Sequence, residues 1–240
     1  VSLAALPSLS RLAADEDWTG FRHVFGRGLR LVLVLILPAA AGLWALAQPL
    51  ITLLFQHGNF SAEDTVMTAR ALHFYLLGLP FAGVDFLLNY TFYARQNTRV
   101  PATVGVISIG FYFVTALLLR GPLGFLGLVL ADSAKQAGHA AIMIALLLRT
   151  EGRPAGQRIL STLLRAGGAS LLMAVAVWAV VAGVALRLDL GSAKLTALVV
   201  VAAGGALGAV FYLALMRLLR VEEVSGVVGT VMDRLLRRKR

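Results

Sequence analysis

The sequence contains no cysteine, which excludes a disulfide framework and any thiolate metal site. Charged residues are also scarce, at 14% of the chain, whereas about a quarter is typical of soluble domains. The four histidines are scattered without the spacing of metal ligands. We therefore expect no metal and no other cofactor.

Catalytic motifs are missing as well. The sequence has no cluster of paired carboxylates, no phosphate-binding glycine loop and no Ser/His/Asp pattern at a suggestive spacing. Its polar residues lie instead inside long apolar segments. This distribution favours transport over covalent chemistry, so we expect a transporter and not an enzyme. A membrane glycosyltransferase or phosphatase would need a catalytic loop motif upstream.

Long hydrophobic runs dominate what is present, and 59% of the residues are hydrophobic. A helix needs about 20 apolar residues to cross a bilayer. Six segments reach that length, and none shows the alternation of a membrane β-barrel. The sequence thus predicts an all-α, polytopic transmembrane helical bundle with about six complete spans, at residues 31–55, 66–93, 100–119, 121–148, 160–186 and 193–219.

The basic residues orient this bundle. The net charge is +10, and all but five of the 22 Lys and Arg residues fall in connections on one side of the predicted spans. The exceptions are Lys135, within a span, and Arg70, Arg120, Arg187 and Lys194 on the other side. By the positive-inside rule, the basic side and the C-terminus are cytoplasmic. Since topology and membrane lipids account for the charge, we expect no nucleic-acid partner.

The chain divides into four parts by composition. The first residue is Val1, and residues 1–10 resemble the end of a hydrophobic segment, so we expect a fragment with one or more spans upstream. Trp18, Phe21, Val24 and Phe25 are spaced to form the apolar face of an interfacial helix. We expect residues 1–30 to hold the end of a preceding transmembrane helix and a cytoplasmic interfacial connection, and residues 31–149 to form four spans. Residues 150–219 would form two additional, strongly apolar spans, and residues 220–240 a basic cytoplasmic tail on the inner leaflet.

Three local signals refine the spans. Pro38 and Pro49 in the first span indicate a packing kink or a functional hinge. Ser61, followed three residues later by Asp64, forms a capping-box pattern at the start of the second span. The small residues at 202–209 predict close helix contact in the last span.

Polar residues inside two spans are the candidate site. The second span carries Asp85 and Asn89 on one face, and the fourth carries a face composed of Asp132, Lys135, Gln136 and His139. Ionised groups in a membrane are costly, so these faces must meet protein or water. Two interpretations stay open: a self-neutralising Asp132–Lys135 pair, or the wall of a hydrated cavity. The residues alone indicate part of a secondary transporter or flippase.

Several motifs resemble a known family. They are LPSLSR at 6–11, LPAAAGLWALAQPLITLLFQHGNF at 37–60, FYARQNTRVP at 92–101 and GPLGFLGLVLADSAKQAGHA at 121–140. These segments are similar to the C-terminal half of the MurJ/MviN lipid II flippases, within the multidrug/oligosaccharidyl-lipid/polysaccharide exporter superfamily. The resemblance covers residues 3–150 well, and the last two spans match in kind only.

The resemblance implies a fourteen-helix, two-lobe transporter in the bacterial inner membrane. In that family, lipid II, the undecaprenyl-pyrophosphate-linked peptidoglycan precursor, moves from the inner to the outer leaflet by alternating access. Residues 1–10 would end the eighth helix, and the six spans would be helices nine to fourteen. The last two helices would form a groove for the lipid tail. Lipid II, membrane lipids and a missing N-terminal lobe are thus the expected partners.

The same resemblance marks a cytoplasmic loop motif at Arg95, Gln96, Asn97 and Pro101. The family often has Asp where this chain has Asn97, so a charge role there does not carry over. The family's substrate-gripping arginines lie mainly upstream, and none is assigned here. A related exporter of O-antigen-type lipid-linked sugars or organic cations is the alternative function, and a cell-wall scaffold that binds without transporting is another.

Overall fold

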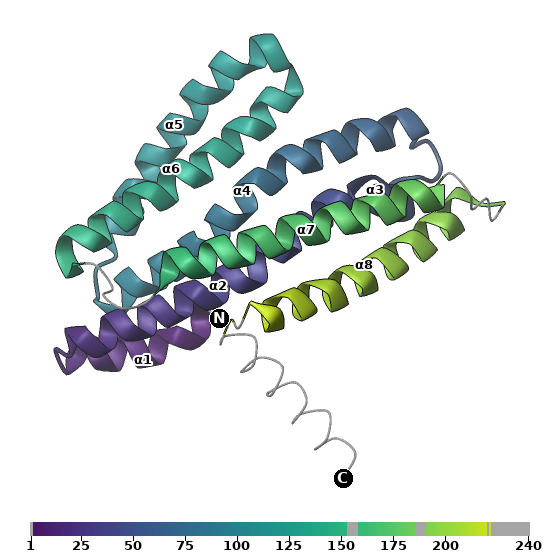
Figure 1. The fold of residues 1–240 in the computed structure, drawn as a ribbon. Coiled ribbons are helices and arrows are strands. Elements are labelled where there is room, and N and C mark those ends of the chain that lie inside the picture. The colour runs from purple at the N-terminus through teal and green to yellow at the C-terminus, as the bar shows by residue number, and fades with distance from the viewer. Residues whose placement is uncertain (1, 153–157, 186–190, 220, 222–240) are drawn as a thin grey trace.

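The computed structural model describes residues 2–152, 158–185, 191–219 and 221. These residues form eight α-helices (Figure 1). The all-α prediction is therefore confirmed. The predicted tail at 220–240 lies, except for Val221, outside the described residues. The helices are α1 (Ser2–Ala14), α2 (Trp18–Ala45), α3 (Ala47–Phe55), α4 (Ala62–Ala94), α5 (Arg99–Leu123), α6 (Phe125–Glu151), α7 (Ile159–Ala185) and α8 (Ala193–Leu218).

Five of these helices, α2, α4, α5, α7 and α8, are long and apolar enough to cross a membrane. The chain is thus a multi-pass membrane protein. The helix α6 is also long, at 27 residues, but it is not among the five. The polar residues at its centre lower its hydropathy. The sixth span therefore stays a prediction.

The prediction of one continuous span over 31–55, preceded by a separate interfacial helix, is wrong. Residues 18–30 are instead the first turns of α2, whose N-terminus is capped by Asp17 through a hydrogen bond from the Gly20 amide, 2.8 Å long. Phe21 and Phe25 are only 1% and 5% exposed. The predicted apolar face is part of α2 and packs in a buried cluster with other helices.

The helix break falls at Leu46, between the two predicted kink sites. The helix α2 continues through Pro38 to Ala45, and Pro49 lies in the first turn of α3. Proline has no amide hydrogen, so Pro49 cannot donate to the carbonyl four residues earlier, as a continuing helix would require. This missing hydrogen bond explains why a new helix begins just before Pro49.

The start of α4 follows the predicted capping box. The Ser61 hydroxyl accepts a hydrogen bond from the Asp64 amide at 3.1 Å, and the Asp64 carboxylate accepts one from the Ser61 amide at 2.8 Å. The box satisfies amides that the first turn of a helix leaves without partners. The cap prediction is confirmed.

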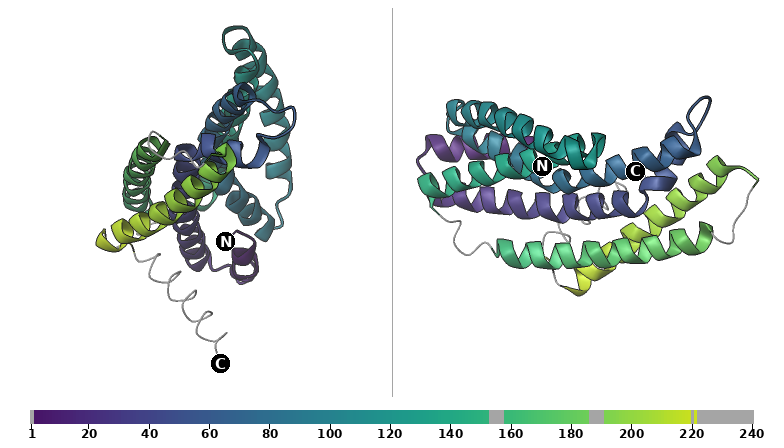
Figure 2. Two further views of the ribbon diagram at one scale, coloured as in Figure 1. Left: turned by 90° about the vertical axis from the view of Figure 1, so that its right-hand side faces the viewer. Right: turned by 90° about the horizontal axis from the view of Figure 1, so that it is seen from above.

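The helices α2 and α4 occupy the centre of the molecule. The α5–α6 hairpin packs on α4 through α6, and the α7–α8 pair packs on α2 and α3 from the other side (Figures 1 and 2). One buried cluster joins α1, α2, α4, α5 and α6, and a second joins α2, α7 and α8. The helix α2 therefore contributes to both clusters and connects the α4–α6 side to the α7–α8 pair.

The last two helices, α7 and α8, are closely packed, as the small residues at 202–209 predict. A side chain added at Gly204 or Gly208 would come within 3.4 Å and 3.1 Å of Val177 on α7. The Tyr212 hydroxyl of α8 donates a hydrogen bond of 2.7 Å to the Val34 carbonyl of α2. The last helix is thus tied to the centre of the molecule.

Candidate functional site

The intramembrane polar residues form two groups. In the first, His139 of α6 meets Asp85 of α4, with 2.6 Å between Nδ1 and Oδ1. Because a carboxylate can only accept, the imidazole Nδ1 is the donor. The Asn89 amide nitrogen donates to the other carboxylate oxygen of Asp85 at 2.9 Å. The side chains of His139 and Asp85 are 11% and 17% exposed, so this group joins α4 to α6 within the packed interface.

The second group lies along α6 alone. The Lys135 ammonium donates to the Asp132 carboxylate at 2.5 Å and lies over the Tyr112 ring of α5, 5.8 Å from its centroid. The two charged side chains are 26% and 28% exposed. The self-neutralising pair is therefore present. Gln136 is half-buried on the same face and, within the described residues, has no hydrogen-bond partner.

About two helical turns from the Asp85–His139 contact, close backbone packing sets the spacing between α4 and α6. The Ser133 hydroxyl donates to the Phe74 carbonyl at 2.6 Å. A side chain at Gly78 would lie 2.8 Å from the Ser133 Cα, closer than real contacts allow. Gly78 thus permits the approach of the two helices that brings Asp85 to His139.

The predicted loop motif at 95–101 belongs to a structural cluster at one end of the bundle. The Arg95 guanidinium pairs with the Glu151 carboxylate at 2.7 Å and lies over the Trp18 ring, 5.4 Å from its centroid. Arg22 of α2 donates to the Glu151 carbonyl at 2.8 Å. The cluster ties the ends of α2, α4 and α6 together. Sequence reasoning missed Glu151, although an acidic residue after a long apolar helix was the available signal.

The other residues of the motif shape the turn. Gln96 has a positive φ of 56°, and Pro101 lies in the first turn of α5, where proline is tolerated. The Asn97 side-chain oxygen accepts a hydrogen bond from the Val100 amide at 3.3 Å. This hydrogen bond needs an oxygen acceptor and no charge, so the amide oxygen of Asn97 is sufficient.

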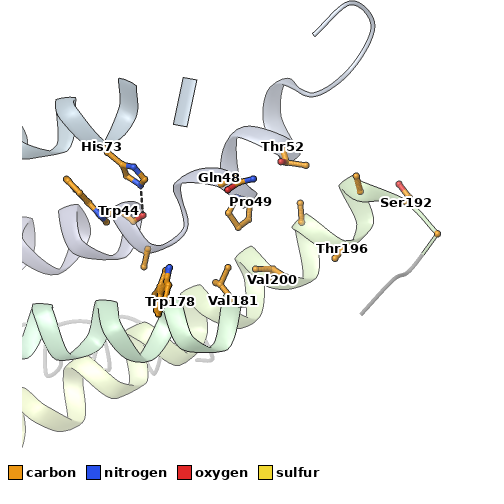
Figure 3. A pocket seen from close by; sticks show the side chains of 14 residues that line it. Trp44, Gln48, Pro49, Thr52, His73, Trp178, Val181, Ser192, Thr196 and Val200 are labelled. Atoms are coloured by element: carbon orange, nitrogen blue, oxygen red, sulfur yellow. Dashed lines mark hydrogen bonds between the residues drawn. The ribbon is translucent and has the colours of Figure 1, made fainter. Parts of the chain in front are cut away.

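A pocket of about 580 Å³ lies at the opposite end, between the α2–α3 break, α4, α7 and the start of α8 (Figure 3). Trp44 stacks on His73 with 4.6 Å between ring centroids, and the His73 Nε2 donates to the Trp44 carbonyl at 3.1 Å. Trp178 and Val200 line the opposite wall. Sequence reasoning did not find this pocket, because its lining comes from helices far apart in the chain. The described residues contain no group of three His, Asp or Glu placed to hold a metal ion.

Comparison with known proteins identifies the fold. The helical arrangement is similar to that of a solved lipid II flippase MurJ in an inward closed conformation, with a TM-score of 0.70 and 22% identity. That likeness covers 92% of this chain and 43% of the solved chain. It therefore places these helices within the larger fold of that protein.

Relatives agree with the structural likeness. The chain is 32% identical over 149 residues to a probable lipid II flippase MurJ from Vibrio cholerae, and 28% identical over 189 residues to one from Haemophilus influenzae. These alignments cover 62% and 74% of this chain but only 28% and 36% of the relatives. A sequence model of the family described as lipid II flippase MurJ matches residues 1–199. The chain therefore belongs to the MurJ family of lipid II flippases.

Proposed function

We propose that this chain is the C-terminal part of a lipid II flippase of the bacterial inner membrane. Such a protein moves the undecaprenyl-pyrophosphate-linked peptidoglycan precursor from the inner to the outer leaflet by alternating access, without covalent chemistry. The family match over residues 1–199 is the observation that carries this proposal. Its partners are lipid II, membrane lipids and an N-terminal lobe. The basic end of the bundle and the C-terminus are cytoplasmic.

Within this function, the polar residues divide into two roles. Asp132, Lys135 and Gln136 line the lobe's side of a hydrated central cavity, since their side chains are the more exposed group. Asp85, Asn89 and His139 lie behind them and hold α4 against α6. Hydrogen bonds between polar side chains commonly serve this purpose between membrane helices.

The pocket beside Trp178 holds part of the polyprenyl chain. It is lined mainly by apolar side chains and lies between the strongly apolar α7–α8 pair and the α2–α3 break. An isoprenoid segment needs such an apolar groove with few polar contacts. The break before Pro49 is the hinge that lets α3 move with α8, against which it packs.

A leaflet-accessibility assay for lipid II tests the function. Cells depleted of their own flippase are complemented with the natural full-length chain, and lipid II exposed at the outer leaflet is measured. We expect exposure to be restored. Stable binding of lipid II without restored exposure would instead indicate a scaffold, and restored export of another lipid-linked sugar would indicate a sister exporter.

Two substitutions test the site within the same assay. Replacing Asp132 and Lys135 together by Ala is expected to abolish lipid II exposure while expression stays normal. The exchange Asp132→Lys with Lys135→Asp preserves the ion pair and serves as the control for folding. Normal exposure in the double Ala variant would refute the cavity role.

A second pair of substitutions tests the proposed binding of the polyprenyl chain in the pocket. Trp178→Ala is expected to lower lipid II exposure several-fold, because the polyprenyl chain loses a large apolar contact. Leu171→Ala removes an exposed side chain from the same helix outside the pocket and is expected to have little effect. Equal effects of the two variants would refute the groove role.

A further inference from the structure

The middle of the α4–α6 interface has one negative charge that its neighbours do not balance. Asp132 and Lys135 cancel each other through their direct contact. The partners of Asp85 are the neutral amide of Asn89 and the imidazole of His139. The formal charge of these groups is therefore minus one when the imidazole is neutral, and zero when it carries a second proton.

The helix α2, which packs on α4, supplies no cation to Asp85 among its described contacts. It meets α4 through an apolar face, on which Gly28 lies beside Leu87 and Ile36 lies beside Gly83. Arg30 lies one helical turn from Val34, whose side chain belongs to the buried cluster shared with α7 and α8. Among the described ion pairs and hydrogen bonds, Asp85 is contacted by Asn89 and His139 and by no charged group of α2.

The remaining neighbours of the described interface bring no balancing charge either. On α5, the two arginines, Arg99 and Arg120, lie at the two ends of the helix, Phe111 faces Gly138, and Tyr112 lies under the Lys135 ammonium. The helix α1 has a single charged residue, Arg11, in its last turn, and α3 has none. The imidazole of His139 is therefore the group that can neutralise Asp85.

On the imidazole, the geometry leaves one position for a neutralising proton. The imidazole Nδ1 already donates its hydrogen to Asp85, so the second proton binds at Nε2. The separation of 2.6 Å is short, and hydrogen bonds that involve charged groups are shorter than those between neutral groups. Because an uncompensated charge is costly in a membrane interior, uptake of this proton lowers the free energy of the closed interface.

We propose that the Asp85–His139 pair is a proton-binding site, and that the bound proton locks α4 against α6. One proton from solution adds to Nε2 of His139, and the pair changes from a net charge of minus one to zero. Its release weakens the contact between the two helices. The role of this lock in transport rests on the proposed flippase function, whereas proton binding itself does not.

The neighbouring contacts indicate how release would act. Gly78 and Ser133 hold α4 and α6 in close backbone contact two helical turns away from the pair. They do not involve a titratable group. Loss of the proton would thus loosen one end of the α4–α6 interface, while the Gly78–Ser133 contact serves as the pivot. The Asp132–Lys135 face lies on the same helix and would move with it.

A spectroscopic experiment tests proton binding directly. The natural full-length chain, with ¹⁵N-labelled histidine, is placed in lipid nanodiscs, and the His139 signals are assigned by their loss in His139→Gln. We expect His139 to gain a proton at Nε2 when the pH is lowered. In Asp85→Asn the proton uptake of His139 should change, because the carboxylate that accepts from Nδ1 is gone. An unchanging ring, or an identical transition in Asp85→Asn, would overturn the proposal.

A transport experiment tests the lock. Lipid II exposure is measured over a range of pH for the parent chain, His139→Gln and His57→Gln, the last altering an exposed histidine in the α3–α4 connection. We expect the pH dependence to disappear only in His139→Gln. A parent chain that exposes no lipid II would refute the flippase function and leave the spectroscopic result standing. A profile unchanged by His139→Gln would refute the lock.

Discussion

At the scale of single residues, Glu151 is the acidic group on which one end of the bundle depends. Its carboxylate is 7% exposed and pairs with Arg95, while its carbonyl accepts from Arg22. Removing one partner of a buried pair leaves the other charge uncompensated. The cluster therefore stabilises the junction of α2, α4 and α6 more than an exposed ion pair would.

We predict that Glu151→Gln destabilises the protein by roughly 1–3 kcal/mol, the range for a lost hydrogen bond to a charged group. Thermal unfolding of the natural full-length chain in detergent measures the change. Glu63→Gln alters an exposed acidic residue in the first turn of α4 and should have a much smaller effect. Similar unfolding temperatures for both variants would contradict the role of the cluster.

The sequence predicted the individual polar residues well and their pairing only in part. Asp132 and Lys135 are neighbours on one helix, so helical spacing alone brought them together. Asp85 and His139 were each recognised as unusual, but their contact depends on how closely α4 and α6 approach. Glu151 was missed because burial at a helix end is decided by other helices, which a single sequence does not reveal.

At the scale of secondary-structure elements, Gly78 controls the packing of α4 on α6. Its missing side chain lets the Ser133 backbone approach, whereas a side chain at Gly110 on α5 would have nothing within 4 Å of its Cβ. Both glycines are in helices and neither has a positive φ. They differ therefore in packing alone.

We predict that Gly78→Ala costs roughly 1–3 kcal/mol through overpacking. Gly110→Ala should be neutral or stabilise by up to about 1 kcal/mol, because alanine has the higher helix propensity. Unfolding in detergent compares the two variants. If Gly78→Ala is as stable as Gly110→Ala, the close approach does not set the helix spacing.

Helix boundaries show where sequence patterns were sufficient. The Ser61–Asp64 capping box fixed the start of α4, because both partners are local. The boundary at Leu46 was missed although Pro38 and Pro49 were both noted. Proline limits a helix only where its missing hydrogen bond is not compensated by packing, and α2 passes through Pro38 without a break.

At the scale of the whole molecule, the helix ends alternate between two sides, as the charge pattern requires. The cluster of Arg22, Arg95 and Glu151 lies on the side of the basic connections, and the Trp44–His73 pocket lies at the other. We propose, from the positive-inside rule, that the first side is cytoplasmic. This orientation can be measured because the chain contains no cysteine of its own.

We predict that a cysteine introduced as Glu63→Cys reacts with a membrane-impermeant maleimide in intact cells. Asp15→Cys, in the exposed connection between α1 and α2, should react only after the membrane is permeabilised. Both variants are made in a full-length background without other cysteines. The reverse labelling pattern would invert the topology.

The low hydropathy of α6 has a consequence for synthesis of the protein. A segment with Asp132 and Lys135 at its centre enters the bilayer poorly alone, since each such residue costs about 2.5–3.5 kcal/mol during insertion. The preceding helix α5 is strongly apolar, and only Gly124 separates the two. We expect α5 and α6 to enter the membrane together as a hairpin. Glycosylation mapping of α6, with and without α5 before it, would detect this dependence. If α6 inserts only behind α5, the Asp132–Lys135 pair makes membrane insertion of these two helices cooperative.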